Sequence, residues 1–64
     1  MKFSLFMTLL EFVPEKTRLI HKGKILGDYN GKESFWAKEE VQNMEIEVVE
    51  VSHFDKKIIL EVIK

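Results

Sequence analysis

Two runs in the last third of the chain, "MEIEVVEVS" and "KKIILEVIK", restrict its fold more than any other feature, and a turn at His-Phe-Asp-Lys joins them. In the first run, Met44, Ile46 and Val48 alternate with glutamates, which is the period of a strand with one buried face. The alternation then changes phase to Val49 and Val51, as happens where a β-bulge inserts one residue. The runs therefore predict a β-hairpin whose first strand has a bulge at Val48–Val49.

The second run is apolar on both faces. Ile58, Leu60 and Val62 alternate on one side of it, and Ile59 and Ile63 on the other. Strands buried on both faces lie inside a sheet. We therefore expect a central strand, or a strand that contacts a second copy of the chain.

A second hairpin is predicted nearer the N-terminus. Two β-prone runs, 17–21 and 25–29, flank Gly23, and a glycine there permits the positive φ of a tight turn. Asn-Gly at 30–31 ends the second run, because this dipeptide strongly favours turns. Gly27 lies within that run, where a glycine indicates a bulge or the close approach of another group.

The N-terminal segment "FSLFMTLLEF" predicts a helix that ends before Pro14. Ser4 and Thr8 are candidate N-caps, and Thr8 with Glu11 has the spacing of a capping box. A strand over residues 2–10 is the alternative, because alternate residues there are apolar.

A shorter helix is predicted over residues 35–42, with Ser34 as its N-cap and with Trp36 and Val41 facing the core. Together these elements predict one α+β domain spanning residues 1–64. Its four-stranded antiparallel sheet consists of two hairpins, with the N-terminal helix on one face and the short helix between the hairpins.

Several classes of chemistry lack the residues that they need. The chain has no cysteine, so a metal site at its two histidines, His21 and His53, would need carboxylate partners such as Glu50 or Asp55. "GKES" differs from a phosphate-binding loop, because Glu33 stands where that loop needs a hydroxyl. Serine, histidine and aspartate occur in no catalytic spacing. We expect no enzymatic activity, no cofactor and no metal.

The apolar N-terminal run is about ten residues long, too short to span a bilayer. No small-residue cleavage site follows it. We therefore expect no membrane association and a cytoplasmic protein.

Charge is unevenly distributed along the chain. Residues 1–32 carry six Lys/Arg and three Asp/Glu, whereas residues 33–64 carry four and eight, so the two halves differ as +3 and −4. Such an acidic half can occupy a groove that normally holds nucleic acid, and tryptophan is a favoured interface anchor. The candidate partner-binding residues are Trp36, Glu39, Glu40, Glu45, Glu47 and Glu50.

The basic half supports an alternative, because lysines neutralise phosphates and an aromatic ring stacks on bases. The candidate nucleic-acid-binding residues are Lys16, Arg18, Lys22, Lys24 and Tyr29.

The segment "LLEFVPEKTRLIHKGKILG", residues 9–27, resembles the opening of small orphan proteins of phages, prophages and other mobile elements of Gram-positive bacteria. They share a Leu-rich helix, a proline-containing turn, a strand of the form Thr-x-aliphatic-x-aliphatic, and a glycine turn before a second strand. The matching positions are Leu9, Leu10, Phe12, Pro14, Thr17, Leu19, Gly23, Leu26 and Gly27. The segment "NGKESFWAKEEV" has no counterpart in that pattern.

Proteins of this kind include anti-CRISPR inhibitors, which bind an effector nuclease and block its DNA. The resemblance implies a stoichiometric inhibitor of such a nuclease, or of its guide-loaded complex, in the cytoplasm of the bacterial host. Two alternatives stay open: a nucleic-acid-binding accessory protein that uses the basic hairpin, and a homo-oligomeric assembly protein that uses Ile59 and Ile63 as its contact.

Overall fold

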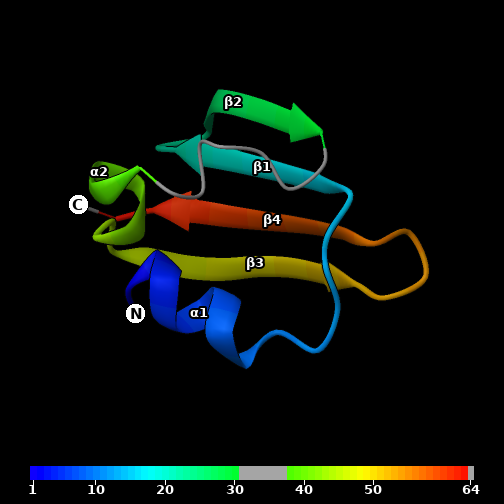
Figure 1. Cartoon of the computed structure of the whole chain (residues 1–64). Coiled ribbons are helices and arrows are strands. Elements are labelled where there is room, and N and C mark those ends of the chain that lie inside the picture. The colour runs from blue at the N-terminus through cyan, green and yellow to red at the C-terminus, as the bar shows by residue number, and fades with distance from the viewer. Residues whose placement is uncertain (31–37, 64) are drawn as a thin grey trace.

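The computed structural model describes residues 1–30 and 38–63, which form two helices and four strands (Figure 1). In chain order the elements are α1 (Phe3–Leu9), β1 (Lys16–His21), β2 (Lys24–Asn30), α2 (Glu39–Gln42), β3 (Ile46–Ser52) and β4 (Lys57–Val62). The class is α+β, as the sequence predicts. No helix in these two described ranges is long and apolar enough to cross a membrane.

The four strands form one sheet in the order β2-β1-β4-β3. Both predicted hairpins are present as antiparallel pairs, β1 with β2 and β3 with β4. The prediction of a fully antiparallel sheet is wrong, because β1 and β4 pair in parallel, with Lys16 beside Lys57 and Leu19 beside Leu60. Figure 1 shows the arrows of β1 and β4 pointing the same way. The two hairpins meet where β1, the first strand of one, pairs with β4, the last strand of the other. β4 is therefore a central strand of the sheet.

Each hairpin contains a bulge. In β3 the register passes from Val48, opposite Leu60, to Glu50, opposite Ile59, so Val49 is the extra residue. This confirms the bulge predicted at Val48–Val49. In β2 the extra residue is Leu26, next to Gly27.

Gly27 is also closely approached by another group, the second situation in which a glycine is expected within a strand. A Cβ placed on Gly27 would lie 2.6 Å from the hydroxyl oxygen of Tyr29 and 2.8 Å from Cζ of its ring. The Tyr29 ring therefore occupies the space that any larger residue at position 27 would need.

The hairpin turn between β1 and β2 has positive φ at both central residues, 51° at Lys22 and 80° at Gly23. A type I′ turn requires this pair of angles, and its twist matches that of the flanking strands. Gly23 adopts its angle without steric strain, which explains why glycine stands there.

Both helices cover the same face of the sheet. Phe3 and Phe6 of α1 and Val41 of α2 are buried in one cluster with side chains from three strands. The strand residues of this core are Leu19, Ile46, Ile58, Leu60 and Val62. Burial of these apolar surfaces supplies the main favourable free energy of folding.

Helix α1 begins earlier than the predicted caps. Lys2 occupies the N-cap position without a side-chain cap bond, whereas Ser4 and Thr8 lie inside the helix. The Thr8 hydroxyl donates to the carbonyl oxygen of Ser4 at 2.9 Å. The helix ends at Leu9, well before Pro14, so neither predicted cap position nor the proline sets its limits.

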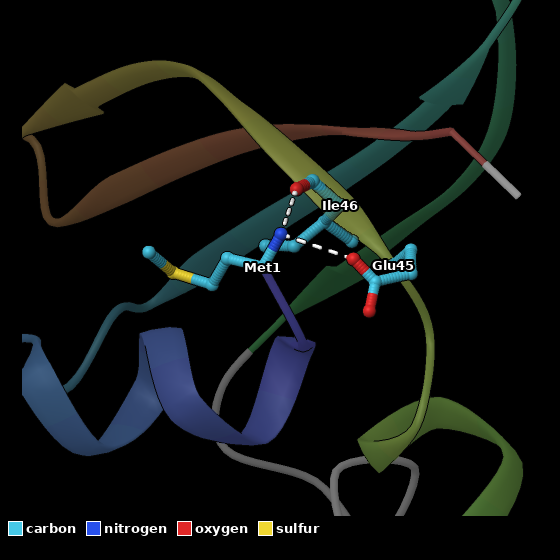
Figure 2. Close-up of polar contacts among 3 residues, drawn as sticks. All are labelled: Met1, Glu45 and Ile46. Atoms are coloured by element: carbon cyan, nitrogen blue, oxygen red, sulfur yellow. Dashed lines mark hydrogen bonds and ion pairs between the residues drawn. The ribbon is translucent and has the colours of Figure 1, made fainter.

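Contacts with residues 44–46, which lead into β3, explain where α1 begins. The Phe3 amide donates to the Met44 carbonyl at 2.9 Å, and the Ile46 amide donates to the Met1 carbonyl at 2.8 Å. Figure 2 shows the Met1 amino group between the Glu45 carboxylate, 3.1 Å away, and the Ile46 carbonyl, 3.2 Å away. Residues 1–3 thus lie along the edge of the sheet, and the chain turns into the helix directly after this contact.

Helix α2 is shorter than the predicted helix over residues 35–42. Lys38 is extended, with φ −68° and ψ 130°, and the helix begins at Glu39. Glu39 and Glu40 lie in the first turn, where negative charge stabilises the positive end of the helix dipole. Ser34 and Trp36 lie outside the described residues. Val41 is buried, as predicted.

Candidate binding face

The face of the sheet opposite the helices carries most of the charged strand residues, and we call it the open face. Alternation along each strand and the register between strands place its members. They are Ile25, Asp28 and Asn30 of β2, Lys16, Arg18 and Ile20 of β1, Lys57, Ile59 and Glu61 of β4, and Glu47, Glu50 and Ser52 of β3.

One corner of the open face is acidic. Glu47 lies directly opposite Glu61, and Glu50 lies opposite Ile59, two residues before Glu61 on β4. The bulge at Val49 keeps Glu47 and Glu50 on the same face. Within the described residues none of these three glutamates forms an ion pair, so no described side chain neutralises their charges.

The diagonally opposite corner is basic. Lys16 and Lys57 are neighbours across the parallel pair, and Arg18 follows Lys16 on the same face of β1. A cavity of about 280 Å³ opens here. Its lining residues are these three cations together with Thr17, Asp28, Tyr29 and Asn30. This corner therefore holds three positive charges and one negative charge.

Arg18 and Asp28 are held together by two hydrogen bonds. Arg18 donates from Nε to Oδ1 of Asp28 at 2.7 Å and from Nη2 to Oδ2 at 3.0 Å. These bonds hold the pKa of the Asp28 carboxyl below its ordinary value, and the charges of Arg18, Lys57 and Lys16 act in the same direction. Asp28 in turn raises the pKa of Arg18. Asp28 is therefore a fixed anion that orients the Arg18 guanidinium.

The predicted acidic set is only partly brought together. Glu47 and Glu50 share the open face, whereas Glu39 and Glu40 lie exposed on α2 and Glu45 is paired with the amino group of Met1. Five glutamates that follow one another in the sequence therefore do not form one surface. Trp36, the sixth member, lies outside the described residues.

The predicted basic set is also divided. Lys16 and Arg18 lie on the open face, and Lys22 and Lys24 are exposed at the tip of the hairpin. Tyr29 lies on the other side of the sheet, where its half-buried side chain packs against the core. Tyr29 also contributes to the lining of the cavity beside Lys16 and Arg18, but the packing of its side chain against the core does not present the ring for stacking on a base.

Sequence reasoning missed two charged members of the open face, Lys57 and Glu61. Both belong to β4, a run dominated by apolar residues. The alternation of Lys57, Ile59 and Glu61 was a signal that could have found them, because these residues share one face of the strand.

The two histidines lie in separate places. His21 contacts the Val62 carbonyl oxygen through Nδ1 at 2.8 Å, which links the ends of β1 and β4. The ring of His53 lies 4.8 Å from that of Phe12, centroid to centroid. In the described ranges no three His, Asp or Glu side chains are grouped as metal ligands would be.

No family model, curated protein or solved structure matches this chain.

Proposed function

We propose that this chain is a protein-binding module whose acidic corner, Glu47, Glu50 and Glu61, docks on a cationic surface. The observation that carries the proposal is the pairing of Glu47 with Glu61. Like charges directly opposite each other destabilise a sheet. Departures of this kind from local rules are expected at functional sites, and a cationic partner would neutralise the charges.

The partner that we propose is a nucleic-acid-binding groove of a CRISPR effector nuclease or of its guide-loaded complex. Such grooves are lined by cations, and carboxylates spaced along a strand can occupy them in place of phosphates. The choice of this partner comes from the resemblance to small proteins of mobile elements. With this partner the protein acts in the cytoplasm of the bacterial host.

The test measures binding of the chain to the purified guide-loaded nuclease, and the inhibition of DNA cleavage, across a titration. The test variant is Glu47→Lys with Glu50→Lys. The control is Glu11→Lys with Glu15→Lys, which makes the same change in charge at exposed positions off the open face. We expect the test variant to lose affinity by about tenfold or more and the control to bind as the original chain does.

Equal affinity of the two variants would rule out the acidic corner as the interface. Absence of any binding by the original chain would rule out this nuclease as the partner. The nucleic-acid alternative predicts instead that the original chain binds an oligonucleotide with an affinity that falls steeply with salt.

A further inference from the structure

We propose that the basic corner of the open face is a binding site for a phosphate group in its dianionic form. The ligands would be Lys16, Arg18 and Lys57, with the Asn30 amide as a further donor. This site is separate from the acidic corner and does not depend on the proposed partner.

The first argument is the arrangement of the three cations. Lys16 and Lys57 are register partners on adjacent strands, which lie roughly 5 Å apart. Lys16 and Arg18 are two residues apart on one strand, roughly 7 Å along it. Three cationic side chains that rise from the corners of such a triangle can surround one tetrahedral oxyanion.

The second argument is charge. Asp28, which is bound to Arg18 by two hydrogen bonds, offsets one of the three positive charges. The basic corner therefore has a net charge of +2. A phosphate monoester or inorganic phosphate carries about −1.5 to −2 near neutral pH, so it matches this charge more closely than a singly charged phosphodiester.

The third argument is that the donors are available. Arg18 uses only Nε and Nη2 toward Asp28, so its Nη1 group is not used in this pair. Neither Lys16 nor Lys57 forms an ion pair with any described residue. The cavity of about 280 Å³ lies just below the usual range for drug-sized ligands, which favours a small anion.

The experiment is a titration of the isotope-labelled chain with inorganic phosphate at constant ionic strength, followed by the amide signals of Lys16, Arg18, Asn30 and Lys57. We expect saturation with a dissociation constant on the order of millimolar. Phenyl phosphate is the second probe, and its binding would identify a phosphate monoester on a larger molecule as the source of the group.

The test variant is Lys16→Gln with Lys57→Gln, and Lys57→Gln alone serves if the double variant does not fold. The control is Lys22→Gln with Lys24→Gln, which removes the same charge at exposed positions off the open face. We expect the test variant to lose affinity by about tenfold or more, and the control to retain it.

Two outcomes would overturn the site. One is a linear, unsaturated response to phosphate that is equal in the test and control variants. The other is binding of an oligonucleotide without terminal phosphates, together with no binding of inorganic phosphate. That second outcome would favour the nucleic-acid alternative.

Discussion

Glu47 and Glu61 lie directly opposite each other in the antiparallel pair of β3 and β4, on the face that no described helix covers. A like-charged cross-strand pair costs roughly 0.2–1 kcal/mol relative to a neutral pair, and an opposite-charged pair gains a similar amount. Glu47→Lys is therefore expected to raise the free energy of unfolding by about 1 kcal/mol. Urea denaturation at low and at high salt measures the change, which salt should reduce.

The control for this prediction is Glu11→Lys, which changes the same charge at an exposed position outside the sheet. A variant at Glu47 that gains stability while losing its partner would show that the acidic pair is retained for binding. A loss of stability on Glu47→Lys would mean that repulsion between the two carboxylates does not weaken the sheet.

Thr17 is a buried polar residue on the core side of the sheet, with 1% of its surface exposed, and its hydroxyl has no hydrogen-bond partner among the described residues. A buried hydroxyl without a partner costs about 1–3 kcal/mol. Thr17→Val keeps the branched shape and removes the hydroxyl, so we expect the free energy of unfolding to rise by about 1 kcal/mol.

Thermal or urea unfolding measures this change, and Thr17→Ser is the matched control. The serine keeps the unpaired hydroxyl and loses a buried methyl group, so that variant should be destabilised by about 1 kcal/mol. If valine and serine lower the stability equally, the hydroxyl has a stabilising contact and the prediction fails.

The Tyr29 ring restricts position 27 to glycine, because it fills the space that a larger side chain there would need. Gly27→Ala should lower the free energy of unfolding by about 1–3 kcal/mol, because the new Cβ meets the Tyr29 ring. In a Tyr29→Ala background the same change should cost nothing, and alanine should even be favoured over glycine in a strand. A double-mutant cycle measures the coupling between the two positions. Additive effects would mean that the ring moves aside freely.

Local patterns predicted the parts of the fold that neighbouring residues determine. The alternation around Val48 and Val49 located the bulge, and the two apolar faces of residues 57–63 indicated a central strand. The parallel pairing of Lys16 with Lys57 could not be predicted in this way. It joins strands from opposite ends of the chain and depends on how the two hairpins pack together.

The candidate surfaces show the same division between local and long-range information. Strand alternation places Glu47 on the open face. Glu45 instead forms an ion pair with the amino group of Met1, which is a contact between segments far apart in the sequence. Tyr29 is near the lysines in the sequence, but strand alternation places it on the opposite face of β2 from Asp28 and the open face. Side-chain periodicity was therefore a better guide than proximity in sequence.

The Arg18–Asp28 pair is expected to make stability depend on pH in acid. The pKa of Asp28 is lowered in the folded chain, chiefly by its hydrogen bonds from Arg18. The contribution of the Asp28 charge to the free energy of unfolding is therefore complete above the ordinary aspartate pKa of about 4. It is lost as the pH falls through the lower pKa that Asp28 has in the folded chain. Asp28→Asn should abolish this contribution, so the stability difference between the original chain and the variant should shrink as the solution is acidified.

Urea unfolding of both proteins over this range measures the difference, with Glu11→Gln as a control for the loss of one carboxylate. A difference that stays constant from neutral to strongly acidic pH would mean that the pair does not contribute through the charge of Asp28.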